Sequence, residues 1–521
     1  MPTWATPVTA SMRRAGSRPA FRSPAGAEGS LARGEESVVR HEESLLRVAR
    51  FANALRERGI GPGDRVALVV DIGPGAVEAY LAVGLTGATA VQVNDRLQAT
   101  EIAEILELAQ PRAVIRTTAH AERLEDVLTG RGVDVIGWGG RLDLDVEQAV
   151  TQGSGVLPAV LVDPASPGIV GFTSGTTGRP KGVVHTHENL ARIIRHMPNH
   201  DGLRWGSRCG FTGTLAFAAG IWGVVMPHLY VGGELSFMAG FTPDRWVDRM
   251  IAQRTNFTYA PTPLMGAFAN EVRQRPEVLE HLDGVLHSGS LAPPEAVEDL
   301  VDAIGHRYVE TYGMTETGAP ITATVPDDWR SGSEADDMFA SAGRAVSIAQ
   351  VLILDEQGNE LPAGEVGEVV VESETLFAGY LNDPEQTADA LRNGRLHTGD
   401  LGSLDAAGYV YVRGRAKDMI VTGGMNVYPA EVERVIARAD GVADVAVFGV
   451  ADERWGETVA AAIVAKPGER VDVDELTGFV RANLASYKKP TVVKVLDELP
   501  RNASLKVRKD VLRREFEENR S

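Results

Sequence analysis

Short apolar runs alternate with amphipathic segments along much of the chain. Residues 43–58 carry apolar side chains near helical spacing, which predicts a helix. Residues 65–70, RVALVV, follow the turn sequence Gly-Pro-Gly-Asp and predict a buried strand. Further apolar runs predict strands at residues 113–116, 133–138 and 168–172. Helices that alternate with buried strands indicate an α/β protein built on parallel sheets.

The pattern changes in the last third of the chain. Residues 368–372 and 408–412 are short alternating strands set off by glycines, and they predict a mixed or β-barrel-like segment. A compact α+β pattern follows, with helices expected at 427–438 and 473–485, strands at 442–450 and 457–464, and a last strand and tail helix after residue 490. We therefore predict a large N-terminal domain at residues 1–414 and a small C-terminal domain at residues 415–521.

The composition is that of an ordinary globular protein. Of the 521 residues, 44% are hydrophobic and 24% are charged, which excludes a disordered, collagen-like or disulfide-framework protein. The single cysteine, Cys209, allows no intrachain disulfide and favours a reducing compartment. No run of about 20 apolar residues predicts a membrane span. Residues 15–33 are small and polar, lack an apolar signal core and are expected to form a loose lead-in, so we expect a cytoplasmic protein.

The net charge of -19 is unevenly distributed. Residues 1–414 hold 34 basic and 53 acidic residues, whereas residues 415–521 hold 18 of each. The acidic excess argues against nonspecific nucleic-acid binding by the whole chain. The neutral C-terminal part carries basic clusters at residues 488–489 and 506–509, which fit either a local polyanionic ligand or a solvated helix face.

The most informative segment is FTSGTTGRPKG at residues 172–182. Three glycines let the backbone approach a ligand, four hydroxyl groups offer hydrogen bonds, and one lysine supplies positive charge, as a polyphosphate requires. A P-loop would run directly into a helix, whereas Pro180 and Gly182 oppose one here. The segment therefore predicts a phosphate-binding loop of another type, made by Thr173, Ser174, Gly175, Thr176, Thr177, Gly178 and Lys181.

This loop resembles the phosphate loop of the adenylate-forming superfamily, which includes acyl- and aryl-CoA synthetases, luciferase and peptide-synthetase adenylation domains. Matching segments follow in the same order and span nearly the whole chain, and acyl- or aryl-CoA ligases are the nearest in pattern. YGMTE, which starts at Tyr312, resembles the second signature. The resemblance implies that Thr315 contacts the α-phosphate and that Glu316 helps to hold Mg²⁺. Carboxylate and hydroxyl oxygens are the hard ligands that Mg²⁺ prefers.

Three further segments resemble the rest of the nucleotide site. TGD ends at Asp400, which by resemblance accepts hydrogen bonds from the ribose hydroxyls, as an acceptor-only carboxylate can. In GRAKD, Arg415 also reaches the ribose, and Lys417 is the hinge of a mobile C-terminal domain. Gly289 and Ser290 resemble the segment that packs against adenine.

The C-terminal part carries two more resemblances. Gly423 and Gly424 resemble the turn that lines the pantetheine tunnel for CoA, and the same turn also precedes a predicted helix. PRNASLKV resembles the catalytic-lysine loop, with Lys506 as the match and Lys509 as the fallback. Most members have glycine where this chain has Leu505, and this difference affects which backbone conformation the loop is expected to adopt. The resemblance also implies that acetylation of Lys506 regulates the protein.

The resemblance implies a two-step reaction that uses ATP, Mg²⁺ and CoA. The acid's carboxylate attacks the α-phosphorus of ATP, acyl-AMP forms and pyrophosphate leaves. A thiol then attacks the acyl carbon, and AMP leaves. Lys506, Lys181, Thr315 and Glu316 are the expected catalytic residues, since they position anions and neutralise charge. Rotation about Lys417 then exchanges Lys506 for the glycine turn at the reacting atoms.

The acid pocket is also inferred by resemblance. Aryl-CoA ligases of the benzoate type carry a phenylalanine where Phe217 stands, although core packing is the alternative for this side chain. Ala218 replaces the aspartate that pairs with an amino group in peptide-synthetase domains, which disfavours an α-amino acid. Residues 259–263 and 314–320 are the other expected walls. An aromatic or bulky alicyclic acid of secondary metabolism is favoured, in a pocket lined by Phe217, Gly220, Ala260, Met314, Gly318 and Ala319.

Several alternatives stay open at this point. The acceptor is either CoA or the phosphopantetheine of an acyl carrier protein, and the sequence does not separate them. A catalytically silent nucleotide-binding scaffold is opposed by the complete set of charged signature residues. The protein is expected to be a monomer or homodimer without nucleic-acid or membrane partners. His185 and His187 are expected to be structural, and no His/Cys metal cluster is apparent.

Overall fold

The computed structural model describes residues 1–24, 36–174, 180–238, 242–330, 335, 337–452, 454–502 and 506–518. The chain divides into two compact units, Met1–Val351 with Val371–Leu396, and Leu352–Val370 with His397–Ser521. The second unit therefore includes β-structure that precedes residue 415. The predicted boundary between residues 414 and 415 marks where a hinge between two domains is expected, and it stays a prediction.

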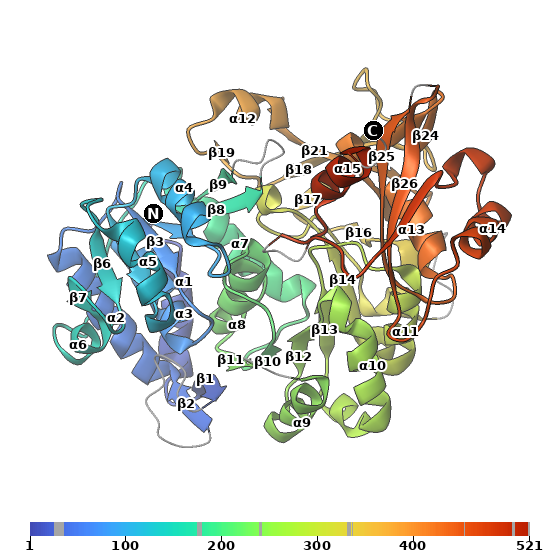
Figure 1. Ribbon diagram of the computed structural model, residues 1–521. Helices are drawn as coiled ribbons and strands as arrows, with labels where there is room; N and C mark the ends of the chain where they lie inside the picture. The colour runs from blue at the N-terminus through green and yellow to red at the C-terminus, as the bar shows by residue number, and fades with distance from the viewer. Residues whose placement is uncertain are drawn as a thin grey trace. The chain divides into compact units, whose positions relative to one another are not determined.

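An eight-stranded sheet in the first unit carries the predicted phosphate loop (Figure 1). Its strand order is β19-β9-β8-β4-β3-β5-β6-β7. Strand β9 runs antiparallel to both of its neighbours, β8 and β19, and all other neighbouring pairs are parallel. The strands are β3 (Arg65–Val69), β4 (Thr89–Gln92), β5 (Ala113–Arg116), β6 (Asp134–Gly137), β7 (Leu144–Asp145), β8 (Pro167–Ser174), β9 (Pro180–Thr186) and β19 (Gly379–Tyr380). Four of these strands confirm the predicted apolar runs, because strands buried on both faces carry little polar alternation.

Helices flank this sheet along the chain. They are α2 (His41–Glu57), α3 (Pro74–Thr86), α4 (Ala99–Ala109), α5 (Ala121–Leu128), α6 (Val146–Thr151) and α7 (His187–His200). Helix α2 confirms the helix predicted at residues 43–58. Helix α3 is buried at every position, which explains why it is apolar all round instead of along one stripe.

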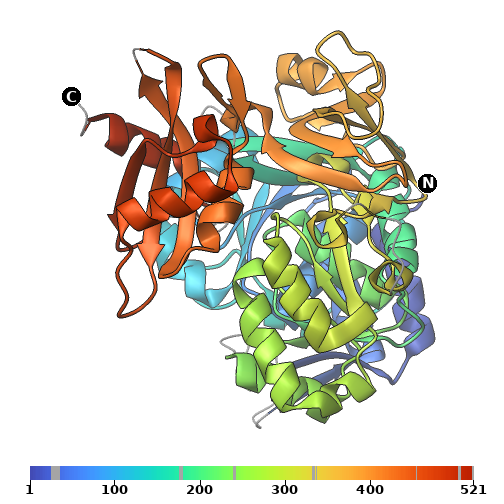
Figure 2. The same cartoon turned by 90° about the vertical axis from the view of Figure 1, so that its right-hand side faces the viewer.

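A nine-stranded sheet forms the other half of the first unit. Its order is β16-β15-β14-β13-β12-β10-β11-β1-β2, and the strands from β14 to β1 are parallel. The strands are β1 (Pro19–Pro24), β2 (Glu36–Arg40), β10 (Arg208–Phe211), β11 (Glu234–Phe237), β12 (Phe257–Tyr259), β13 (Gly284–His287), β14 (Tyr308–Tyr312), β15 (Thr322–Ala323) and β16 (Arg344–Ala345). Helices α10 (Met265–Gln274) and α11 (Pro294–Ile304) lie side by side (Figure 2), and Phe268 and Leu300 share one apolar cluster with Val285 of β13.

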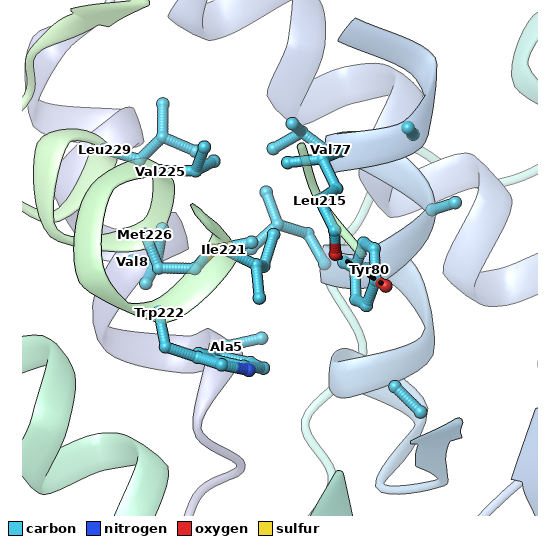
Figure 3. Packing of buried hydrophobic residues seen from close by; sticks show 14 of the residues in the cluster. Ala5, Val8, Val77, Tyr80, Leu215, Ile221, Trp222, Val225, Met226 and Leu229 are labelled. Atoms are coloured by element: carbon cyan, nitrogen blue, oxygen red, sulfur yellow. Dashed lines mark hydrogen bonds between the residues drawn. The ribbon is translucent and has the colours of Figure 1, made fainter. Parts of the chain in front are cut away.

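The largest apolar cluster joins helices α1 (Ala5–Ala15), α3 and α8 (Met226–Tyr230) with the π-helical segment η2 (Ala219–Val225). Figure 3 shows Ile221 and Trp222 of η2 among residues of α1 and α3. The Tyr80 hydroxyl donates to the Leu215 carbonyl at 3.5 Å, which gives this aromatic side chain a polar partner inside the core.

The N-terminal segment belongs to this core, so the expected loose lead-in is wrong as far as Ser23. Trp4 is fully buried and lies edge-on against Trp222, with ring centres 4.8 Å apart. Strand β1 pairs in parallel with β11, and Phe21 is fully buried. No periodic pattern marks this burial, because isolated apolar residues stand among small polar ones and their partners are distant in the sequence. Residues 25–33 lie outside the described part.

Two smaller sheets complete the fold. One has the order β17-β18-β21-β20, with β22 beside β21. Its strands are β17 (Ala349–Leu354), β18 (Gly367–Ser373), β20 (Leu391–Arg392), β21 (Arg395–Leu404) and β22 (Val410–Arg415). The other lies in the second unit and has the order β24-β23-β26-β25, with β27 beside β26. Its strands are β23 (Ile420–Thr422), β24 (Met425–Val427), β25 (Val442–Asp452), β26 (Gly456–Ala465) and β27 (Val492–Leu496).

Three helices pack on the sheet of the second unit, namely α13 (Pro429–Ala437), α14 (Val473–Asn483) and α15 (Lys509–Glu518). Helices α13 and α14 share one apolar cluster with the sheet, and α15 packs in another through Leu512 and Phe516. This arrangement confirms the predicted α+β module. Helix α13 begins later than predicted because Val427 completes β24. Within the described residues, no helix combines the length and apolar character that crossing a bilayer requires.

Candidate functional site

The predicted phosphate loop lies at the tip of the β8–β9 hairpin. In its register, Thr173 pairs with Lys181, and both side chains are half-buried. Pro180 begins β9, so the chain returns as a strand and does not enter a helix, as the sequence predicted. The loop residues Gly175, Thr176, Thr177 and Gly178, and the side chain of Ser174, lie outside the described part.

The second predicted signature starts where β14 ends. Tyr312 is the last residue of β14, and a short 3₁₀ turn then presents Thr315, which is half-buried, and Glu316, which is 6% exposed. Gly289 and Ser290 follow the parallel neighbour β13 and are exposed. The carboxyl ends of adjacent parallel strands therefore present both segments at one edge of the sheet, where ligands of α/β proteins bind.

His185 on β9 connects the phosphate hairpin to the second signature. Its Nε2 atom lies 2.7 Å from the carbonyl oxygen of Thr315, and the side chain is buried. Burial lowers the pKa of His185 to about 4, so the neutral ring donates its Nε2–H to this carbonyl. Gly318 allows the close approach, because a Cβ there would lie 2.8 Å from the histidine ring. The motif analysis did not identify this positioning contact.

Tyr380 joins two of the predicted charged residues. Its hydroxyl donates to Oε1 of Glu316 at 2.8 Å, and its ring centre lies 5.2 Å from Nζ of Lys181, a cation-π distance. Strand β19 pairs with β9, with Tyr380 opposite Val183, and this pairing places the tyrosine there. Sequence reasoning missed Tyr380 because both partners are far away in the chain; a tyrosine in a short strand carries no signal of its own.

The predicted ribose residues, Asp400 and Arg415, form one ion pair in the second unit. They are register partners in the β21–β22 hairpin, and Nε of Arg415 lies 2.7 Å from Oδ1 of Asp400. Arg415 also donates through Nη1 to the carbonyl oxygen of Thr398 at 3.0 Å. Asp400 is 6% exposed, so its carboxylate is held in place. One hairpin thus brings together two residues that were predicted for the same ligand.

The predicted tunnel turn is a tight hairpin. Gly423 and Gly424 connect β23 to β24, are exposed, and have φ angles of +57° and +81°. Positive φ at both central residues is the requirement of a type I′ turn, which glycine meets without strain. A Cβ on Gly423 would also lie 2.8 Å from the ring of Trp455. Both glycines are therefore required by the fold, whatever they do for a ligand.

The predicted hinge and catalytic lysines lie on the surface of the second unit. Lys417 is exposed in a short 3₁₀ segment between β22 and β23. Lys506 is exposed, and its backbone N–H donates to Oδ1 of Asn502 at 3.0 Å. Leu505 lies outside the described residues, so its effect on this loop stays a prediction.

The six predicted pocket residues differ in accessibility. Phe217 and Met314 are half-buried, whereas Ala260 and Ala319 are buried within apolar clusters. The other two, the glycines, are buried as well. A hollow of about 660 Å³ occurs elsewhere in the first unit, between Glu374 and Gly394, and none of its lining residues was predicted.

Packing accounts for the small size of both predicted pocket glycines. A Cβ on Gly220 would lie 1.9 Å from the carbonyl oxygen of Thr214. A Cβ on Gly318 would lie 2.6 Å from Cδ1 of Ile193, and the φ of Gly318 is +68°. Both glycines were expected to line the acid pocket, whereas the protein itself fills the space beside them.

Asp71, Asp95 and His120 form a group that the sequence analysis did not find. They lie at the carboxyl ends of β3, β4 and β5, and their ligand-type atoms are within 4.8 Å of one another. Arg123 donates to Nδ1 of His120 at 2.9 Å, and Nε2 of His120 lies 3.1 Å from Oδ1 of Asp71. The His120 hydrogen bond lowers the pKa of Asp71. A guanidinium that faces the imidazole opposes a metal ion, and the group is a hydrogen-bonded network.

Comparison with known proteins agrees with these observations. The sequence profile of AMP-binding enzymes matches residues 9–381, and that of the AMP-binding enzyme C-terminal domain matches residues 431–506. Feruloyl-CoA synthase from an Amycolatopsis species is 34% identical over 501 residues, which cover 96% of this chain and 99% of that protein. The long-chain-fatty-acid–CoA ligase FadD13 of Mycobacterium tuberculosis is 34% identical over 476 residues, or 90% of this chain and 91% of that protein.

A solved structure shows the same likeness in three dimensions. The crystal structure of ATP-bound MatB from Rhodopseudomonas palustris matches with a TM-score of 0.87 at 27% identity, over 98% of this chain and 100% of that one. The profile matches cover most of both the N-terminal and the C-terminal part of the chain. The chain therefore belongs to the family of AMP-binding enzymes, within which it is an AMP-forming acid–CoA ligase.

Proposed function

We propose that the protein adenylates an aromatic carboxylic acid with ATP and transfers the acyl group to CoA. The observation that carries the proposal is the linked group of Lys181, Tyr380 and Glu316 beside Thr315. A cation on β9, a hydroxyl on β19 and a carboxylate in the turn after β14 are held together, and such a group suits a triphosphate with its metal ion. The strand pairing of β19 with β9 fixes this group before a ligand arrives.

The proposed roles follow from this group. Lys181 and the hairpin tip bind the β- and γ-phosphates, and Thr315 contacts the α-phosphate. Glu316 offers a hard carboxylate oxygen that fits Mg²⁺, while its Oε1 accepts from Tyr380. When bound, Mg²⁺ would neutralise charge on the phosphates. Lys506 is proposed to bridge the acid's carboxylate and the α-phosphate.

The remaining roles are proposed for residues on other elements. Asp400 and Arg415 bind the ribose hydroxyls, and Tyr312, Gly289 and Ser290 adjoin the adenine. Lys417 is the hinge, and the turn of Gly423 and Gly424 lines the pantetheine path. Each of these assignments rests on the resemblance together with the position of the residue in its element.

The preference for an aromatic acid rests on two half-buried side chains, Phe217 and Met314. An aromatic ring and a thioether offer polarizable contacts to a ring, whereas neither can form an ion pair. Similarity to feruloyl-CoA synthase, whose name denotes an aromatic acyl group, supports the same class. The glycines at positions 220 and 318 contribute less than the sequence predicted, because their space is filled.

The test is a mass-spectrometric search for acyl-CoA. Purified protein is incubated with ATP, Mg²⁺ and CoA and with ferulate, benzoate, aminobenzoate, cyclohexane carboxylate or a fatty acid. The proposal expects a cinnamate or benzoate to give the strongest product, dependent on both ATP and CoA. A fatty acid as best substrate would contradict the aromatic preference. AMP and pyrophosphate release without acyl-CoA would assign a carrier protein as acceptor.

A further inference from the structure

Four side chains form a continuous hydrogen-bonded chain at the carboxyl ends of β12, β13 and β14. Nδ1 of His287 lies 2.9 Å from both carboxylate oxygens of Glu310. Nε2 of His287 lies 2.8 Å from the Thr262 hydroxyl, which lies 2.7 Å from the Ser290 hydroxyl. We call Ser290, Thr262, His287 and Glu310 the hydroxyl–imidazole relay. The signature motifs account for Ser290 alone among these four residues.

The relay has a defined direction. The Glu310 carboxylate accepts the hydroxyl of Tyr308 as well as the imidazole, so Nδ1 of His287 carries a proton and donates it. In this tautomer Nε2 presents a lone pair, which accepts from the hydroxyl of Thr262. Because the Thr262 hydroxyl donates its only proton to His287, its oxygen accepts the hydrogen bond from the Ser290 hydroxyl. The chain is therefore ordered to pass a proton from Ser290 inward to the ring.

The two ends of the relay lie in different environments. His287 is fully buried and Glu310 is 8% exposed, whereas Thr262 is half-buried and Ser290 is exposed. A buried base oriented by a carboxylate and linked through a hydroxyl to the surface is the arrangement by which enzymes activate a nucleophile. An ion-pair role between two strands would not require the two hydroxyls that continue the chain outward.

The acid–CoA ligase reaction needs one proton acceptor, and only in its second half. The acid enters as a carboxylate, so its attack on the α-phosphorus releases no proton. The thiol must lose one when it attacks the acyl carbon. In that step the sulfur–carbon bond forms, the carbon–oxygen bond to AMP breaks, and AMP leaves with the electron pair. The thiol proton requires a base with access to the reacting bond.

We propose that the hydroxyl–imidazole relay is the general-base path for the thiol, with His287 as the final proton acceptor. This inference rests on the proposed function, in which Thr262 lies in the expected acid-pocket wall and Ser290 in the expected adenine segment. The thiol attacks the acyl carbon, and Thr262 brings the relay to the expected wall of the pocket that holds the acyl group. Glu310 stabilises the imidazolium that forms.

The experiment separates the two half-reactions in the full-length protein. Pyrophosphate release from ATP and an acid, without CoA, reports adenylation. Quenched-flow mixing with CoA and synthetic feruloyl, benzoyl or dodecanoyl adenylate reports transfer, between pH 6 and pH 10. Thr262→Val keeps the side-chain volume and the His287–Glu310 pair but breaks the relay. Thr311→Val is the matched control, because Thr311 donates to the His287 carbonyl at 3.0 Å and lies outside the relay.

The proposal expects His287→Gln to slow transfer by about 100-fold, while adenylation stays within about threefold of the wild type. Because Thr262 lies in the expected acid-pocket wall, adenylation by Thr262→Val is measured at saturating acid, and transfer in this variant should slow by about 100-fold more than adenylation does. In both variants the rate should rise with pH only where a free thiol ionises, near about pH 8.5. Thr311→Val should match the wild type in both assays.

Wild-type transfer rates and an unchanged pH profile in Thr262→Val would overturn the relay. A loss confined to adenylation, with a raised KM for ATP, would also overturn it and assign the chain of hydroxyls to nucleotide binding. Failure of wild-type adenylation with every acid would instead refute the proposed function, a result that the first assay shows separately. Absence of wild-type transfer from all three adenylates would refute a CoA acceptor and the relay with it.

Discussion

The predicted site residues of the two units are held in different ways. In the first unit, Thr315 and Glu316 follow a strand of the nine-stranded sheet and are fixed by His185 and Tyr380, which lie on strands of the eight-stranded sheet. In the second unit, Lys506 bonds to a residue four positions away, and the glycine turn is set by its own hairpin. The first arrangement is a product of tertiary structure, whereas the second is local.

This difference has consequences for mutation. A residue outside the motifs can change the geometry of the phosphate site, because that geometry depends on long-range contacts. Lys417 and Lys506 of the second unit are exposed, so their replacement should remove chemistry at little cost to folding. A site on rigid strands gives precision, while a site on turns allows a group to arrive and leave.

The largest expected effect is that of Lys506→Ala. Adenylation should fall by about 1,000-fold, because the variant lacks the cation that neutralises the carboxylate and α-phosphate in the transition state. Acyl transfer from a supplied acyl-adenylate should persist, and the melting temperature should not change since Lys506 is exposed. Pyrophosphate release and acyl-CoA formation measure the two steps. Lys509→Ala serves as the control, and normal adenylation in Lys506→Ala would refute the assignment.

A smaller effect is expected for Tyr380→Phe. The ring and its contact to Lys181 remain, but Glu316 loses its hydroxyl donor, so the carboxylate is less well oriented. Adenylation should fall by about 10-fold, and the Mg²⁺ concentration for half-maximal rate should rise. Tyr411→Phe is the matched control, because it removes a similar bond to Asp405 in the second unit. Equal adenylation rates and equal Mg²⁺ requirements in both variants would show that the hydrogen bond from Tyr380 to Glu316 has no role in catalysis.

The contrast between these two residues explains what could be predicted from the sequence. Lys506 lies in a contiguous motif, and Pro180 beside Gly182 predicted a strand after the phosphate loop. Buried parallel strands were found because their apolar runs are continuous. Tyr380 was missed, and His185 was expected to be structural but without its partner Thr315, since in both cases the partners come from distant segments and no local spacing records a contact of that kind. Trp4 was missed for the same reason.

Acid should destabilise the first unit more than the second. Burial lowers the pKa of four histidines of the first unit, His41, His185, His187 and His228, to about 4. Between pH 6.5 and pH 4 the unfolded chain therefore binds more protons than the folded one. As the pH is lowered through this range, the free energy of unfolding falls by up to about 1.4 kcal/mol per pH unit for each histidine. Urea unfolding followed by hydrogen exchange in each unit measures this. Equal loss in both units would contradict it.

The smallest effect concerns Asp201, whose carboxylate oxygens have no hydrogen-bond partner among the described residues. Burial raises the pKa of Asp201 well above its usual value, so the folded state keeps the proton. Above about pH 4 the unfolded chain releases that proton, and the wild type loses stability as pH rises. Asp201→Asn should therefore be more stable than the wild type at pH 8 and no more stable than it at pH 4. A difference that is constant with pH would contradict the burial argument.

The central claim is that the acid's own oxygen attacks the α-phosphorus of ATP. The most direct test uses an acid labelled with ¹⁸O in both carboxylate positions, together with ATP, Mg²⁺ and CoA, and analyses the nucleotide and phosphate products by mass spectrometry. The account predicts one ¹⁸O atom in AMP and none in pyrophosphate. Label in inorganic phosphate with ADP as the nucleotide product, or AMP without label, would contradict it.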